Sequence, residues 1–162
     1  MLASGSNGER ALKFLNLNDF SLYKTFNNIY STAYNNSLIE LDNNLFVGEK
    51  GGIRIFQIQN NNIDYVFYKD SFIRILSLSS IGNDFIIAGA TNGNIYLYKI
   101  IKHGNINLEK INVTRNSFEI VKNKFNYSIS GLKYYSQYNK SFIISCFVDG
   151  NIKMYEYFDN EI

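Results

Sequence analysis

The chain has 162 residues, of which 46% are hydrophobic and 16% aromatic, so it can build one core but is too short for two independent domains. The 16 Lys and Arg nearly balance the 14 Asp and Glu, which gives no electrostatic reason to expect nucleic-acid binding. Residues 1–17 lack the pattern of a signal peptide and no apolar run could cross a bilayer, so we expect an intracellular protein, cytoplasmic or nuclear, without a membrane partner.

The first part of the chain predicts short strands separated by polar turns. They are Leu2–Ser6, Ala11–Leu17, Ser21–Phe26, Asn36–Leu41, Leu45–Glu49 and Ile53–Ile58. The last of these places Ile and Phe side chains on both faces of the strand, which is typical of a strand covered on two sides.

The second part of the chain continues the same pattern. Its predicted strands are Ile63–Lys69, Phe72–Leu78, the two arms of Phe85–Ile100, Ile106–Asn112, Tyr127–Tyr134, Ser141–Phe147 and Ile152–Tyr157. Between the two arms, Asn92-Gly93 predicts a two-residue hairpin turn, because Asn and Gly both tolerate a positive φ. Past that turn, Ile95 and Leu97 alternate with Tyr96 and Tyr98, so the two pairs should face opposite ways.

Four copies of one hairpin align along the chain. They are Leu2–Leu17, Leu45–Ile58, Phe85–Ile100 and Phe142–Tyr157. Gly5, Gly48, Gly89 and Cys146 occupy equivalent places in them, and so do the turn glycines Gly8, Gly52, Gly93 and Gly150. A repeat of about forty residues with four short strands and no helical pattern predicts an all-β protein built of propeller blades, with a sandwich of the same hairpins as the alternative.

Leu2-Ala3-Ser4-Gly5-Ser6 and the stretch Val148–Tyr155 resemble the middle strands of WD40 repeats. The Trp-Asp dipeptide of that family is replaced by Leu15-Asn16, Phe56-Gln57, Tyr98-Lys99 and Tyr155-Glu156, and its Gly-His dipeptide is missing. We therefore expect aromatic and aliphatic packing to take the place of the family's side-chain hydrogen bonds.

This resemblance implies a WD40-like β-propeller portion of about three and a half four-stranded antiparallel blades. The blades would occupy roughly residues 1–27, 28–69, 70–112 and 126–162 of a single domain 1–162, with a connector at 113–125. The first blade lacks an inner strand and the last an outer one. We therefore expect a fragment of a longer chain, or a partial ring that another chain or a second copy completes.

The sequence shows no catalytic or metal-binding constellation. The single histidine, His103, lies in a polar link, and the acidic residues are scattered over turns and outer strands. Cys146, the single cysteine, falls in an apolar strand pattern, where a free thiol is expected to be a small buried hydrophobe. We expect no cofactor, no metal and no enzyme activity.

The resemblance therefore favours a non-enzymatic protein–protein interaction scaffold, a WD40-like subunit of a larger intracellular complex. Two other classes stay open. One is a propeller enzyme that acts on a small molecule at the central channel, and the other is an RNA-associated subunit, which would need a basic face.

The connector Val113–Phe125 is the candidate contact site for a protein partner. It contributes Arg115, Phe118, Lys122 and Lys124, and Lys50 comes from a neighbouring turn. The family resemblance implies that this connector emerges on the face of the hairpin turns, where partners bind. A basic and aromatic loop fits a partner with acidic groups and an apolar pocket, and the alternative is a solvated insertion.

Overall fold

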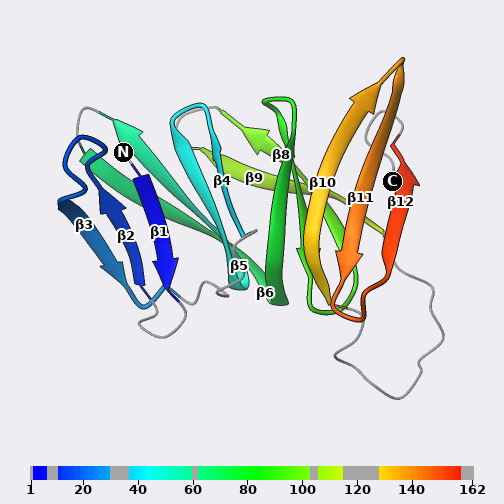
Figure 1. Cartoon of the computed structure of the whole chain (residues 1–162), viewed down its shortest axis with the longest axis horizontal. Helices are drawn as coiled ribbons and strands as arrows, with labels where there is room; N and C mark the ends of the chain where they lie inside the picture. Colours follow the sequence, from blue (N-terminus) through cyan, green and yellow to red (C-terminus); the bar gives the residue numbers. More distant parts are fainter. Residues whose placement is uncertain are drawn as a thin grey trace.

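The computed structural model describes residues 2–6, 11–29, 37–59, 62–102, 106–114 and 128–157. These residues form twelve β-strands and no helix, which confirms the all-β prediction (Figure 1). The strands are β1 (Leu2–Ser6), β2 (Ala11–Leu15), β3 (Leu22–Asn27), β4 (Leu38–Leu41), β5 (Asn44–Gln59), β6 (Asn62–Ile81), β7 (Phe85–Ala90), β8 (Ile95–Ile101), β9 (Asn107–Thr114), β10 (Ile129–Gln137), β11 (Lys140–Phe147) and β12 (Ile152–Glu156).

All strand pairs are antiparallel, and each pair joins two strands that are consecutive in the chain. The sheets have the orders β1-β2-β3, β4-β5-β6-β7-β8-β9 and β10-β11-β12. In the six-stranded sheet, residues 62–69 of β6 pair with β5, whereas residues 75–81 pair with β7. The predicted strands Leu45–Glu49 and Ile53–Ile58 are therefore joined in the single strand β5. The predicted strands Ile63–Lys69 and Phe72–Leu78 are joined in the same way in β6. Each long strand passes a register shift near Lys50 and Gly52, where Gly51 adopts a φ of 93°.

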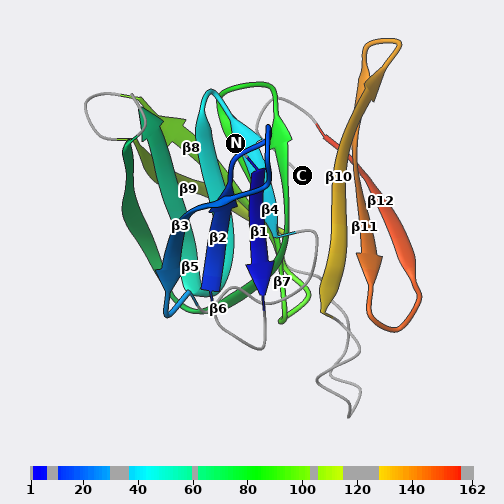
Figure 2. The same cartoon turned by 60° about the vertical axis from the view of Figure 1, so that its left-hand side comes forward.

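The six-stranded sheet folds back on itself at this register shift. Ile53 and Ile55 of β5 belong to the same buried cluster as Ile86 of β7 and Tyr98 of β8, although all four residues lie in one sheet. The molecule is therefore a series of four layers that follow the chain: β1–β3; β4, β5 and the start of β6; the end of β6 with β7–β9; and β10–β12 (Figures 1 and 2).

Three hydrophobic clusters lie between successive layers, and the second and third layers each contribute to two of them. In β5, Ile53 and Ile55 face the third layer, whereas Phe56 packs in the cluster shared with the first layer. In β8, Tyr96 and Tyr98 face the second layer, whereas Leu97 packs against β10 and β11. The predictions that residues 53–58 are covered on two sides and that β8 alternates are both confirmed.

The aligned hairpins share one backbone hydrogen bond at their open end. The donors and acceptors are Ile58 N to Asn43 O at 3.2 Å, Ile100 N to Asp84 O at 2.7 Å and Tyr157 N to Ser141 O at 2.8 Å. The alignment of the last three predicted hairpins is therefore present in the structure as a repeated geometry, with one correction. Gly51, whose φ is 93°, and not Gly52, lies level with Gly93 and Gly150, whose φ values are 80° and 88°.

The prediction of a two-residue turn at Asn92-Gly93 is wrong. The N–H of Ala90 donates to Asn94 O and the N–H of Gly93 donates to Ala90 O, both at 3.1 Å, so three residues form the loop. Within the loop only Gly93 has a positive φ, of 80°. Asn92 instead accepts the Asn94 N–H on its side-chain oxygen at 3.1 Å, which stabilises a turn that continues into a left-handed glycine.

Cys146 is half-buried, so the prediction of a buried thiol is wrong. Its register partner in β12 is Ile152, and the two side chains lie on the face of the last layer that points away from the third layer. No layer that the structure describes covers this face.

Candidate functional site

One edge of the stack of layers gathers the hairpin turns and the starts of the inner strands. We call this the turn edge; it lies at the bottom of Figure 1, where β11 ends and β12 begins. Equivalent backbone hydrogen bonds join the two kinds of segment: Gly48 N to Ser37 O at 2.8 Å, Thr91 N to Arg74 O at 3.0 Å and Val148 N to Ser128 O at 3.0 Å. Contacts from one layer to the next, between Lys50 and Arg74 and between Ser128 and Thr91, place the turns of the second, third and last layers side by side at this edge.

Lys50 is exposed at the turn edge, in the bend of β5. Its register partner is Arg74, which is also exposed, so the fold places two cations side by side. Arg74 was not among the residues predicted for this surface, because it lies within an apolar strand pattern and only the bend of β6 brings it to the edge.

Arg115, Phe118, Lys122 and Lys124 lie outside the residues that the structure describes. The described chain on either side of the connector is nevertheless at the turn edge. Thr114 pairs with Ile95 next to the β7–β8 turn, and the hydroxyl of Ser128 donates to the carbonyl of Thr91 at 3.0 Å.

A buried ion pair holds the hairpin next to Lys50. The guanidinium of Arg54 donates to the carboxylate of Glu49 from Nε at 2.5 Å and from Nη2 at 3.3 Å. Glu49 is buried, and the guanidinium also lies over the rings of Tyr65 and Phe67, 4.7 and 5.2 Å from their centroids. A bidentate contact of this kind fixes the two halves of β5 on either side of the bend, and so fixes the position of Lys50 between them.

A second polar cluster joins the second and third layers near the turn edge. Asp70 accepts hydrogen bonds from the Tyr98 hydroxyl at 2.8 Å and from the Lys110 ammonium at 2.6 Å. The ammonium also lies 4.3 Å from the centroid of the Tyr96 ring, whose hydroxyl accepts a bond from Asn92 at 2.8 Å.

Burial and the charge of Asp70 raise the pKa of the Tyr98 phenol, and the same causes in the same order raise the pKa of Tyr68. Both phenols are therefore protonated at neutral pH. Tyr98 acts as a hydrogen-bond donor to a carboxylate already paired with Lys110, so the cluster joins two layers and offers no poised base.

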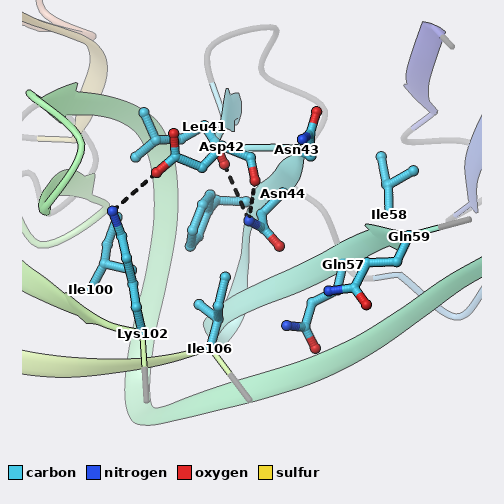
Figure 3. Close-up of a pocket in the computed structure, with 11 residues that line it drawn as sticks. Leu41, Asp42, Asn43, Asn44, Gln57, Ile58, Gln59, Ile100, Lys102 and Ile106 are labelled. Carbon is cyan, nitrogen blue, oxygen red and sulfur yellow. Dashed lines mark hydrogen bonds and ion pairs between the residues drawn. The ribbon is translucent and has the colours of Figure 1, made fainter. Parts of the chain in front are cut away.

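A cavity of about 320 Å³ opens at the edge opposite the turn edge, between the second and third layers (Figure 3). The amides of Gln57 and Gln59 line it together with Asp42 and Lys102. Lys102 pairs with Asp42 at 3.0 Å and with Asp84 at 3.3 Å. The hydrogen bond to Asp42 is the main cause that raises the pKa of the Lys102 ammonium. The charges in the lining are thus already paired, which leaves amide groups for contacts.

Within the described ranges, no group of three or more His, Cys, Asp or Glu residues could hold a metal ion, and His103 lies outside these ranges. The same part of the chain contains no helix that is long and apolar enough to cross a membrane. A scan against protein-family models and a search of curated proteins each found no match.

Proposed function

We propose that the four layers are successive blades of a WD40-like β-propeller portion, and that the chain is a non-enzymatic scaffold for protein–protein interaction within a larger intracellular complex. The second layer has four strands when the two halves of β5 on either side of Gly51 are counted separately, and the third layer has the end of β6 with β7, β8 and β9. The first and last layers have three strands each. Four layers with three cores between them favour blades over a sandwich, which would have two sheets around one core.

The continuity of the turn edge is the main support for an interaction role. Turns from several layers and the described ends of the connector meet there, and backbone hydrogen bonds to the neighbouring strands fix their positions. A rigid scaffold that presents neighbouring loops is a common way to build a binding surface. The exposed side chains of Lys50 and Arg74 add positive charge to it.

The partner that fits this edge is a protein with acidic groups and an apolar pocket. Phe118 would fill the pocket, and Lys50, Arg74, Arg115, Lys122 and Lys124 would face the acidic groups. An exposed charge pair contributes little by itself, whereas an Arg or aromatic side chain that becomes fully desolvated can dominate binding.

Affinity purification with the tagged full-length chain would identify the partner, and binding measurements with edge variants would test the site. We expect Lys50→Glu combined with Arg74→Glu, and separately Arg115→Glu combined with Lys122→Glu and Phe118→Ala, to weaken binding by about thirtyfold or more. Lys140→Glu is the matched control, because Lys140 is exposed beside the β10–β11 turn at the opposite edge.

Unchanged affinity in both edge variants would show that the partner binds elsewhere. Two other results would replace the scaffold by one of the alternative classes. Turnover of a small molecule that depends on Gln57 or Gln59 would favour a propeller enzyme. Recovery of RNA, with binding that weakens steeply as salt increases, would favour an RNA-associated subunit.

A further inference from the structure

The last layer carries a core-forming face that no described layer covers. On β11 and β12, the residues Ile144, Ile152 and Met154 occupy the places that Ile87, Ile95 and Leu97 occupy in the third layer. In the third layer all three are fully buried against β10 and β11. In the last layer, Ile152 is 70% exposed and Met154 is 65% exposed.

The same three positions are also buried in the second layer, where they are Phe46, Ile53 and Ile55, packed against the third layer. Burial of this triplet by a following layer is thus a repeated property of the fold. Its exposure on β11 and β12 leaves an apolar strip, extended by Phe142 and Cys146, of the kind that marks an interaction surface. Lys133 and Glu156 lie beside this strip on the same face.

Cys146 indicates what kind of layer fits on this face. Its equivalents Gly48 and Gly89 are in tight contact with the inner strand of the next layer, because an added Cβ would lie 2.6 Å from Ile75 Cγ2 or 2.5 Å from Ile129 Cγ2. A thiol at this position therefore leaves no room for an inner strand pressed as closely as in the other layers. The covering layer must approach without such a strand.

Among the described layers, the first has this property, because β1 is an edge strand of the sheet β1-β2-β3 and no described inner strand pairs with it. Leu12 and Phe14 of β2 face the second layer, so Leu15 and its register partner Leu22, which is 58% exposed, lie on the opposite face. This face is also uncovered by any described layer.

We propose that the outer face of β10–β12 binds the outer face of β1–β3 in a second copy of this chain, head to tail. This inference deepens the proposed function, because it names what completes the propeller portion. Contact between Ile144, Ile152 and Met154 on one copy and Leu15 and Leu22 on the other would bury both apolar end faces. The two faces differ, so a copy can use one face with each neighbour.

Sedimentation velocity of the full-length chain at several concentrations tests the proposal. We expect self-association that Ile152→Lys weakens by about thirtyfold or more and that Leu22→Lys weakens to a similar extent, because a buried ammonium would be left unpaired. Ile111→Lys is the matched control, since Ile111 is 41% exposed on β9, away from both end faces, and should associate as the wild type does.

Mixing the two end variants distinguishes head-to-tail contact from other arrangements. Each variant keeps one intact end, so an equal mixture should regain one wild-type interface that neither variant has alone. Cys146 supplies an independent readout, because alkylation of this single thiol should slow about tenfold when the wild-type chain associates.

A wild-type chain that stays monomeric at high concentration would overturn the proposal. So would association that Leu22→Lys leaves unchanged while Ile152→Lys abolishes it, because the last layer would then bind its own equivalent face. These measurements contain no other protein. A chain that does not self-associate would therefore contradict this proposal without contradicting the proposed function. Unchanged partner binding in the turn-edge variants would contradict the proposed site without contradicting self-association.

Discussion

Gly89 of the third layer lies in close contact with β10 of the fourth layer, and replacing it by alanine tests that contact. An added Cβ would lie 2.5 Å from Ile129 Cγ2 and 2.5 Å from Ser77 Oγ. Real Cβ atoms do not make contacts this short, so β10 or the Ile129 side chain must move away and Ser77 must also rotate. Rotation would break the hydrogen bond from Ser77 to the carbonyl of Ile129, which measures 3.2 Å.

The cost of Gly89→Ala follows from these contacts. Overpacking of a rigid core by a methyl group costs about 1–3 kcal/mol, and the loss of a buried hydrogen bond adds about 1 kcal/mol. Alanine also lowers the conformational entropy of the unfolded chain, which stabilises the folded state by about 0.4–1 kcal/mol and offsets part of this cost. We therefore expect Gly89→Ala to lower the free energy of unfolding by about 2 kcal/mol.

Urea unfolding followed by far-ultraviolet circular dichroism measures this change. With a typical urea dependence for a small protein, a loss of 2 kcal/mol shifts the midpoint by about 1 M. Cys146→Ala is the control at the equivalent position of the last layer, where the side chain is half-exposed, and its midpoint should hardly move. A Gly89→Ala midpoint at or above the wild-type value would refute the close packing of these two layers.

Two further substitutions probe single polar groups. The raised pKa of Tyr98 means that above its ordinary value of 10.0 the unfolded chain loses the phenolic proton while the folded chain keeps it, so stability falls as the pH rises above 10. Between pH 8 and about pH 10.5 this effect should lower the free energy of unfolding of the wild-type chain by roughly 1 kcal/mol, and Tyr98→Phe should not show this loss. Equal losses for the wild type and the variant in urea unfolding would contradict the prediction. Ser145 Oγ is buried without a hydrogen-bond partner among the described residues, at the place where the third layer has Ala88. Ser145→Ala should therefore raise the free energy of unfolding by about 1 kcal/mol, and a lower thermal midpoint would show that the hydroxyl is satisfied in solution.

Local patterns in the sequence predict much of this fold, because alternation and turn residues act over a few positions. The strands on either side of each turn form where the alternation places them, and Gly48 and Gly89 lie at equivalent close approaches. The type of the Asn92-Gly93 turn was not predictable, because Asn92 stabilises the turn through its side chain and keeps a negative φ. The dipeptide alone is compatible with both geometries.

Contacts between distant residues account for the parts that the sequence does not predict. Asp70 meets Tyr98 and Lys110, which are 28 and 40 positions away, only because two layers stack. Arg74 reaches the turn edge because β6 bends, and an apolar strand pattern does not show where a strand bends. The exposure of Cys146 likewise depends on what covers its layer, which no local pattern encodes.

Phe56 and Tyr98 occupy equivalent positions in β5 and β8, and their contacts show which property of the side chain this position requires. At Phe56 the position is filled by aromatic packing alone, with ring centroids 4.9 Å from Phe26 and 5.7 Å from Phe14. At the equivalent Tyr98, the ring packs 5.6 Å from Tyr68 and its hydroxyl also bonds to Asp70. The layer contact thus requires a bulky ring, whereas its polar partner depends on what the adjacent strand supplies. Aromatic rings thus contribute to the contacts between the first and second layers and between the second and third.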